Sequence, residues 1–184
     1  GLAAAPTLAS SSFNNTTPVA IPTGPGVVTS TLNVTGAGTQ LHDVNLTTFI
    51  THTFAGDLDI TLQSPAGTIV TLTSDNGGGN DNVFNGTIWD DDANPLGQVP
   101  YTTNNGMVTD HAYVNLTLAS PLTPEEALGA FIGENPNGVW TITIDLKANK
   151  DIKFLAAANW GAFDYEDNSG GSQATGTARK IKWE

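Results

Sequence analysis

Apolar and polar residues alternate strictly along the segment 57–62, where Leu58, Ile60 and Leu62 are interleaved with Asp57, Asp59 and Thr61. Such a period of two is typical of a β-strand with one face buried. The run Ser64-Pro65-Ala66-Gly67 follows, and its residue types favour a tight turn. A second apolar run, Ile69-Val70-Thr71-Leu72, comes directly after it. The pattern predicts a half-buried β-hairpin over residues 57–72.

A further strand is predicted over residues 139–144. It follows the turn-rich run Glu134-Asn135-Pro136-Asn137-Gly138. In an extended chain Trp140, Ile142 and Ile144 lie on one face, unless a bulge near Val139 shifts the alternation. We expect this face to enter the core.

Helical character is confined to residues 124–131. Thr123 is suited to be the N-cap, Pro124 to be the first helical residue, and Glu126 to complete a capping box three residues after the cap. Elsewhere short β-branched runs recur at near-regular spacing, among 20 glycines and 10 prolines. The chain of 184 residues is long enough for one sizeable core. We therefore expect a single all-β domain, a sandwich or barrel with one short helix.

Several motifs in this order resemble the P domain that follows the catalytic domain in kexin-like and related bacterial subtilisin-type serine proteases. They are the hairpin string His52–Thr68, a Gly-rich acidic loop at 75–82, Asp90-Asp91-Asp92-Ala93, Pro121-Leu122, and Gly133-Glu134-Asn135-Pro136-Asn137-Gly138-Val139-Trp140-Thr141-Ile142. The resemblance covers roughly residues 12–145. It implies a jelly-roll β-sandwich of the galactose-binding-domain-like type, which serves as a non-catalytic module of an exported, secreted or cell-surface protein. Its implied partner is a covalently linked protease domain.

The ends of the chain depart from this pattern. Residues 1–11 are rich in small residues and are interpreted as a flexible linker or an expression remnant. The domain is expected over residues 12–184, with an atypical C-terminal extension at about 146–184. The last strand of the family has its only candidate equivalent at 176–183, about thirty residues later than the family pattern implies.

Charge is distributed unevenly along the chain. All six basic residues lie after residue 146, whereas 13 of the 18 acidic residues lie before it. The first part therefore has a formal charge of −13, against +1 for the remainder (6 basic minus 5 acidic). Such an acidic surface repels phosphate and argues against nucleic-acid binding. Lys147, Lys150 and Lys153 are interpreted as lining a strand or loop edge, where lysine discourages edge-to-edge pairing.

Clustered carboxylates without cationic neighbours favour a bound cation, and calcium accepts six to eight oxygen ligands. Three clusters qualify: the loop 75–82, Asp90-Asp91-Asp92 with Asn94, and Asp164 with Glu166, Asp167 and Asn168. Asp57 belongs to the family string and is a further candidate. Asn/Asp/Gly runs are also ordinary turns, and none of the clusters matches the Asp-x-Asp-x-Asp-Gly calcium loop. The candidate metal ligands are Asp57, Asp75, Asp81, Asp90, Asp91 and Asp92.

Motifs for catalysis are absent from the sequence. It contains neither a Gly-x-Ser-x-Gly elbow nor a His-Glu-x-x-His stretch, and the surroundings of a subtilisin-type active site are missing. His52 is expected to have a core or hydrogen-bonding role. Glu134 is expected to accept hydrogen bonds from backbone N–H groups of its turn. The chain is therefore not expected to be an enzyme.

Two alternatives remain open. Jelly rolls of this outline also resemble carbohydrate-binding modules, in which exposed aromatic rings stack on sugars. The candidates for that reading are Trp89 and Phe163, together with Trp160, Asp164 and Tyr165 as a ligand-binding group, although core packing is the favoured use of the rings. A polysaccharide or a protein substrate would then be the partner. The other alternative is a cell-surface adhesion module.

No uninterrupted apolar stretch approaches the length needed to span a bilayer, so no membrane span is expected. Cysteine is absent, which excludes disulfides and thiolate metal sites. The absence of cysteine does not distinguish the cytosol from the exterior, because many secreted bacterial proteins are free of it. Secretion is thus implied by the resemblance alone.

Overall fold

The computed structural model describes residues 9–93, 106–147, 163–164 and 180–181. The chain divides into two compact units, Gly1–Asn149 and Lys150–Glu184. The first unit contains the predicted hairpin and the predicted Trp140 strand. The boundaries drawn from sequence, 12–184 for the domain and 146–184 for the extension, stay predictions.

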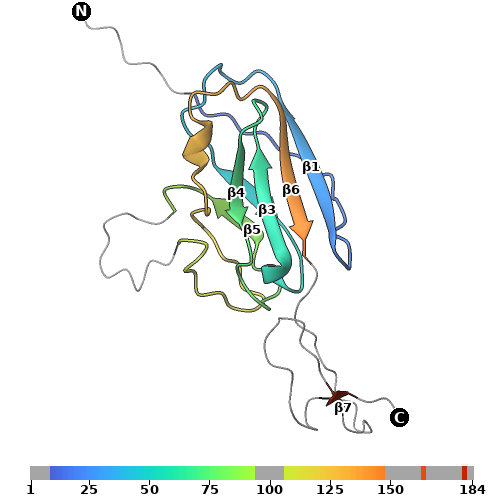
Figure 1. The fold of residues 1–184 in the computed structure, drawn as a ribbon. Coiled ribbons are helices and arrows are strands. Elements are labelled where there is room, and N and C mark those ends of the chain that lie inside the picture. The colour runs from blue at the N-terminus through green and yellow to red at the C-terminus, as the bar shows by residue number, and fades with distance from the viewer. Residues whose placement is uncertain (1–8, 94–105, 148–162, 165–179, 182–184) are drawn as a thin grey trace, which may run out of the picture. The chain divides into compact units, whose positions relative to one another are not determined.

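A four-stranded antiparallel sheet forms one layer of the first unit (Figure 1). Its order is β1 (Gly26–Val34), β6 (Gly138–Leu146), β3 (Leu58–Gln63) and β4 (Ile69–Thr73). The strands β3 and β4 form the predicted hairpin, and Gly67 adopts a φ of 96° in its turn. Strand β6 lies between β1 and β3 and pairs with both. The two segments that the sequence pattern emphasised are therefore neighbours in one sheet.

Two further strands form a second antiparallel sheet, β2 (Leu46–Phe49) with β5 (Asn85–Trp89). This pair lies behind the four-stranded sheet in the view of Figure 1. The segment that follows residue 116 runs beside β5, where Leu122 bridges to Trp89. With two antiparallel sheets around one core, the unit is an all-β sandwich, as the sequence predicted. The jelly-roll connectivity stays a prediction.

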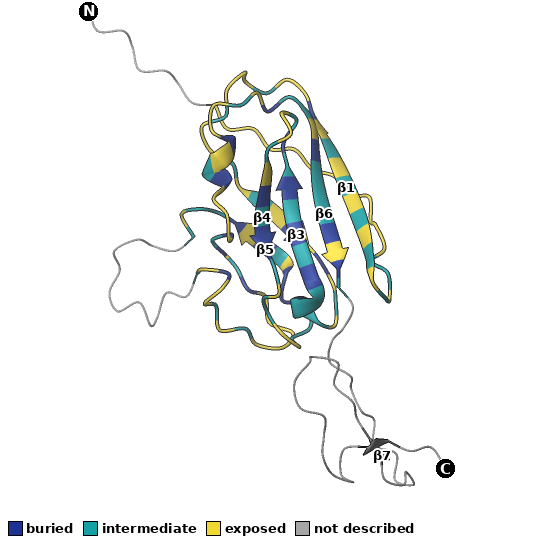
Figure 2. Cartoon of the chain, viewed as in Figure 1, coloured by how far each residue is buried: buried dark blue, intermediate teal, exposed yellow. Residues whose placement is uncertain are grey.

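The core lies between the two sheets, and alternation places its residues there (Figure 2). In β6, Trp140 and Ile144 are buried and Ile142 is half-buried, whereas Val139 and Asp145 are exposed. This confirms the face predicted for the Trp140 strand. Full burial of such side chains contributes about 1.5–3 kcal/mol each. The largest fully buried side chains are Trp89, Phe84, Phe131, Leu58, Ile60, Leu72, Leu122 and Leu128.

The short helix lies where the sequence placed it, but it is smaller and is capped differently. It is the 3-10 helix η3, Leu128–Phe131, and its N-cap is Ala127 without a side-chain cap hydrogen bond. The predicted capping box of Thr123 and Glu126 is wrong. Glu125 and Glu126 instead lie in a bend beside β4, where their N–H groups donate to the carbonyl groups of Leu72 and Thr71. A second 3-10 helix, η1 (Ala55–Asp57), precedes β3 and was not foreseen.

In the second unit, β7 (Phe163–Asp164) pairs antiparallel with β8 (Lys180–Ile181). Strand β8 falls inside the segment 176–183 that was the candidate for the last family strand. Among the residues that the structure describes, no helix has the length and apolar character to cross a membrane.

Candidate functional site

The hairpin turn and the turn before β6 are packed directly against each other. Gly138 has a φ of 132°, and a Cβ atom at this position would lie 2.8 Å from Cβ of Pro65. The hydroxyl group of Thr68 donates a hydrogen bond to the carboxylate of Glu134. The two family motifs are therefore joined by a steric contact and a polar contact. Glu134 accepts this hydrogen bond from a side chain, whereas the sequence interpretation assigned it to backbone N–H groups of its own turn.

Asn137 extends this junction to a third segment. Its Nδ2 atom donates to the carbonyl oxygens of Ala37 and Gly38 at 3.1 and 3.0 Å, and its Oδ1 atom accepts from the N–H of Ala37 at 2.9 Å. In the same turn the indole N–H of Trp140 donates to the carbonyl of Pro136 at 2.8 Å. The polar groups of the Asn-Pro-Asn-Gly motif thus form hydrogen bonds that connect its turn to another loop.

The Gly-rich loop 75–82 packs against the start of the hairpin. The N–H of Gly56 donates to the carbonyl of Gly78 at 2.9 Å, and a Cβ atom at Gly56 would approach Cα of Gly78 to 3.1 Å. His52 exchanges two hydrogen bonds with Asn82, and its Nδ1 atom lies 2.8 Å from the carbonyl oxygen of Phe54. These contacts confirm the hydrogen-bonding role expected for His52. The close backbone approach explains the glycine at position 56, whereas Gly78 is explained by its positive φ of 52°.

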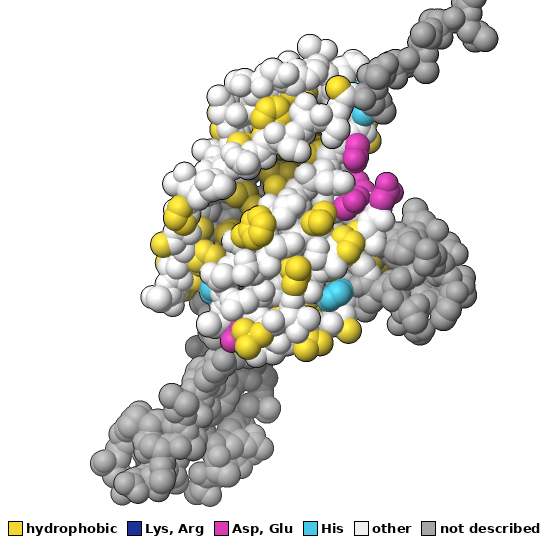
Figure 3. Space-filling model, turned by 180° about the vertical axis from the view of Figure 1, so that it is seen from behind, with side chains coloured by type: hydrophobic (Ala, Val, Ile, Leu, Met, Phe, Trp, Pro, Cys, Tyr) yellow, Lys and Arg dark blue, Asp and Glu magenta, His cyan; other side chains and the backbone are white. Residues whose placement is uncertain are grey.

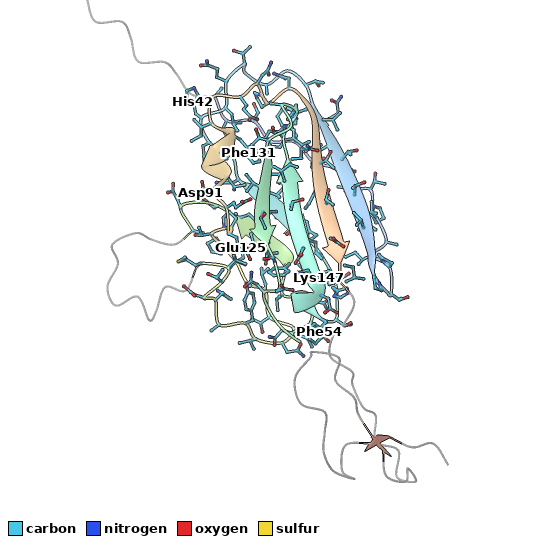
Figure 4. All side chains as sticks on the ribbon, viewed as in Figure 1. His42, Phe54, Asp91, Glu125, Phe131 and Lys147 are labelled. Atoms are coloured by element: carbon cyan, nitrogen blue, oxygen red, sulfur yellow. The ribbon has the colours of Figure 1, made fainter. Side chains whose placement is uncertain are left out.

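The carboxylate of Asp91 caps the short helix from across the chain. Its two oxygens accept hydrogen bonds from the N–H groups of Leu128 and Gly129 at 2.8 and 2.7 Å. Figure 4 labels Asp91 next to this helix and Phe131 within it. Both carboxylate oxygens of Asp91 are therefore engaged with backbone donors, which gives this predicted metal ligand a structural role.

The neighbours of Asp91 point elsewhere. Asp90 accepts hydrogen bonds from Nδ2 of Asn45 at 3.1 Å and from the N–H of Asp92 at 2.8 Å, and Asp92 is exposed. Asn94 lies outside the described residues. Asp90 and Asp92 thus flank a turn, while Asp91 faces η3.

The remaining predicted ligands lie apart from these. Asp75, with a φ of 56°, is ion-paired to Lys147, and the carbonyl oxygen of Asp57 accepts the N–H of Lys147. The N–H of Asp81 donates to the side chain of Asn115 at 2.6 Å. Within the described part of the chain, no three His, Cys, Asp or Glu side chains gather into a group that could hold a metal ion. Calcium stays a prediction.

Lys147 follows β6 directly, and its ammonium group is the counter-ion of two nearby carboxylates (Figure 4). Its Nζ atom lies 2.8 Å from a carboxylate oxygen of Asp59 and 2.9 Å from one of Asp75. The hydrogen bond to Asp59, and then that to Asp75, raises the pKa of Lys147. Lys147 does not line a strand edge, because the strand before it, β6, is an interior strand; the alternative of a loop edge stays a prediction. Lys150 and Lys153 lie outside the described residues.

Replacing Lys147 with methionine is expected to lower the free energy of unfolding by about 0.5–1 kcal/mol, since the ammonium group is partly exposed and solvent screens its ion pairs. The ion pairs contribute fully to the free energy of unfolding at any pH below the ordinary pKa of lysine, about 10.4, because the pKa of Lys147 is raised in the folded state. This contribution is lost only as the pH rises through the pKa of the folded state. Urea unfolding at pH 7 in low salt and in 1 M NaCl measures it. The Lys147→Arg variant is the control. A loss that is equally large in high salt would contradict an electrostatic role.

Glu125 and Glu126 protect the outer edge of β4. The carboxylate of Glu125 accepts hydrogen bonds from the N–H and hydroxyl of Ser74 and from Nδ2 of Asn76. That of Glu126 accepts the N–H of Thr71 at 2.6 Å, and this backbone hydrogen bond lowers the pKa of Glu126. A strand edge with its donors satisfied is a poor template for another chain.

The aromatic residues proposed for sugar stacking are either buried in the core or lie where the structure does not describe their side chains. Trp89 was a wrong candidate, because it is fully buried and its indole N–H donates to the hydroxyl of Thr48 at 3.0 Å. Trp160 and Tyr165 lie outside the described residues. Asp164 and Phe163 are described only as backbone, in β7.

The outer face of the β2–β5 sheet carries exposed hydrophobic side chains instead. Phe49 of β2 is 78% exposed, and Ile88 of β5 is 41% exposed. Leu118, in the segment beside β5, is 48% exposed, and both it and Phe49 lie within 4.0 Å of the Cβ position of Gly86. Figure 3 shows hydrophobic side chains on this side of the molecule. Sequence reasoning missed this face, since two of its three residues belong to short strands whose alternation was not analysed.

A scan against protein-family models matched the proprotein convertase P-domain over residues 41–160. Comparisons with curated proteins and with solved structures gave no match. The matched region contains the hairpin, both turns of the junction, the Asp91 cap and the apolar side chains of the β2–β5 sheet. It covers well over half of the chain.

Proposed function

The chain belongs to the proprotein convertase P-domain family, and from this premise we propose that it is a non-catalytic accessory module of an exported subtilisin-type protease. Domains of this family are normally attached to a protease domain, and the family is found in secreted proteases. The module would support the folding and stability of its linked catalytic domain. Secretion of this chain is part of the proposal.

The observation that carries the proposal is that the side chains of the family motifs form hydrogen bonds within the unit. The side chains that stand out in sequence, such as Glu134, Asn137 and Asp91, accept or donate hydrogen bonds within the unit. Each bond joins segments that are distant along the chain. Polar groups engaged in this way build a rigid scaffold, which suits a module that stabilises a neighbour.

The proposal is tested on the full-length gene product, produced with and without residues 9–184. We expect the shortened form to give at least tenfold less secreted, active protease. A matched variant with a catalytically inactive protease domain separates folding from self-cleavage, because its secreted amount is measured by immunoblotting. Equal yields of folded protease from both forms would contradict the support role. A gene product without a protease domain would contradict the proposal that the partner is a linked protease domain.

A structural calcium ion is a separate part of the proposal. It is supported by the formal charge of −13 on residues 1–146, since like charges in close loops favour a counter-ion. Asp90 and Asp92, which flank the turn beyond β5, are its first candidate ligands.

Calcium is therefore expected to raise the melting temperature of the chelated protein by several degrees at millimolar concentration, through linkage to the folded state. Differential scanning calorimetry after chelation measures the shift, with magnesium at the same concentration as control. The Asp92→Asn variant should lose the shift, whereas Asp110→Asn, an exposed carboxylate elsewhere, should retain it. No shift together with a metal-free sample by elemental analysis would contradict a calcium site.

A further inference from the structure

Strand β1 is an outer strand of the four-stranded sheet, and its sequence contains nothing that protects the edge (Figure 1). The strand pairs with β6 along Gly26–Val34 without a bulge, and none of its residues is charged or a proline. Charged residues, prolines and bulges are the usual features that keep an edge strand from pairing with another chain. The opposite edge of the sheet, that of β4, is covered by Glu125 and Glu126. The two edges of the sheet therefore differ in their protection.

The hydrogen bonds of the sheet show which backbone groups of β1 point outward. In an antiparallel pair, the N–H and C=O groups of alternate residues face the same neighbour. The N–H of Lys147 donates to the carbonyl of Asp57, so the odd-numbered residues of β6 face β3 and the even-numbered residues face β1. Their partners in β1 are even-numbered too, such as Ser30 opposite Ile142. The odd-numbered residues of β1 therefore direct their backbone groups away from the sheet: Val27, Thr29, Thr31 and Asn33.

A contact of Asn15 agrees with this direction. Its Nδ2 atom donates to the carbonyl oxygen of Thr31 at 2.8 Å, as expected for a group that faces away from β6. This oxygen has a second lone pair with which it can accept another hydrogen bond. Residues 9–20, to which Asn15 belongs, are all exposed, and no residue in the described part of the chain forms a backbone hydrogen bond with the outer side of β1. The outward N–H and C=O groups are thus accessible to an added strand.

The alternation of β1 makes the strand complementary to a second copy of itself. About a two-fold axis at Ser30, Thr29 lies opposite Thr31 of the second copy, and Val27 lies opposite its Asn33. Each of these pairs can exchange two backbone hydrogen bonds. Such a contact is isologous, because both copies use the same surface. Since the β4 edge is covered, the association stops at two copies.

The acidic charge of the chain does not oppose this pairing. Asp145 lies opposite Val27, at one end of β1. In the two-fold arrangement the two copies of Asp145 lie at opposite ends of the joined strands, about 20 Å apart along the strand direction. This separation exceeds the Debye length of about 8 Å at physiological ionic strength, so solvent screens their repulsion. Edge pairing is therefore compatible with the formal net charge of −12.

We propose that two copies of the chain associate by antiparallel pairing of their β1 strands. This inference is independent of the proposed function and concerns a strand outside the matched residues 41–160. An unrelated extended peptide is the less favoured occupant, because the exposed side chains of β1 are short and uncharged and give such a peptide little specificity. Edge pairing adds backbone hydrogen bonds but buries little apolar surface, so the dimer dissociates on dilution.

Hydrogen exchange of individual amides, measured by NMR at low and high protein concentration, tests this pairing. The N–H groups of Val28, Ser30 and Leu32, which face β6, should be protected at both concentrations. Those of Thr29 and Thr31 should become at least about tenfold more protected at the high concentration, at which sedimentation should detect a dimer. Rapid exchange of these two amides at both concentrations would overturn the proposal. Their protection in the monomer would also overturn it, because another segment would then cover the edge.

The Thr29→Pro variant removes an outward N–H group and leaves the hydrogen bonds to β6 in place, since proline is tolerated where the N–H of an edge strand faces solvent. Two copies then lose two hydrogen bonds, so the dissociation constant of the dimer should rise at least about tenfold. Thr29→Ala is the matched control, because it removes the same side chain but keeps the N–H group. It should dimerise like the original chain.

A Thr29→Lys/Thr31→Lys variant keeps every N–H group and places lysines opposite each other across the contact. It should lose the dimer through like-charge repulsion, and it decides the matter if the proline variant does not fold. A dimer that persists with an unchanged dissociation constant in the lysine variant would place the contact on another surface and overturn the proposal. Oligomers larger than two copies would overturn the closed two-fold arrangement.

Discussion

Replacing Gly138 with alanine is expected to lower the free energy of unfolding by about 3 kcal/mol, through backbone strain and overpacking. The φ of 132° is one that residues with a side chain rarely adopt. The added methyl group would also lie 2.8 Å from Cβ of Pro65, which belongs to the tight turn of the hairpin and cannot rotate away. For a unit of this size the loss corresponds to a melting temperature lower by about 6–12 °C.

The matched control is Gly133→Ala. Gly133 also has a positive φ, 88°, but nothing lies within 4 Å of the position of its Cβ atom. This variant therefore measures strain without the clash, and we expect it to cost about 1 kcal/mol. Chemical denaturation of both variants gives the two values. Equal losses would show that the contact between the two family turns does not contribute to stability.

Replacing Asp91 with alanine is expected to lower the free energy of unfolding by about 2–4 kcal/mol, since hydrogen bonds to a charged group contribute about 1.5–3 kcal/mol each. Two N–H groups at the start of η3, those of Leu128 and Gly129, would lose their acceptor. The helix also carries Leu128 and Phe131 into the core, and Phe131 packs edge-on against Trp140 at 5.1 Å. Loss of the cap would therefore weaken the contact between the helix and the sheet.

The control for Asp91 is its exposed neighbour, Asp92. The Asp92→Ala variant is expected to change stability by less than about 0.5 kcal/mol in the absence of calcium. Thermal unfolding in the presence of a chelator distinguishes a cap from a metal ligand. A cap predicts the full loss for Asp91→Ala without any calcium, whereas a role as metal ligand alone predicts no loss under these conditions.

Local pattern was sufficient for the strands. The alternation around Ile60 and Trp140 predicted β3 and β6 and the faces that they bury, and the turn residues predicted the hairpin. These features depend on residues close in sequence, whose side-chain period is set by the extended backbone. The family could be predicted in the same way, because each of its motifs is a short run of neighbouring residues.

Local pattern failed where a residue finds its partner far along the chain. A capping box at Thr123 was a sound local interpretation, but Glu125 and Glu126 pair with β4 and the cap comes from Asp91. The carboxylates that suggested calcium are divided among a helix cap, an ion pair with Lys147 and loop hydrogen bonds. Their spacing in sequence says nothing of these partners. The exposed side chains on the β2–β5 sheet were also missed, since Leu118 and Phe49 come together over Gly86 only in the folded unit.

The sequence by itself determined which segments extend, which of their faces is apolar, and to which family the motifs correspond, because these properties follow from neighbouring residues and the backbone period. The tertiary structure alone decided which strands are adjacent, which carboxylate meets which donor, and which hydrophobic side chains stay exposed on the β2–β5 sheet. Those choices depend on contacts between distant segments, such as Pro65 with Gly138 and Lys147 with Asp59, whose formation minimises the free energy of the whole unit.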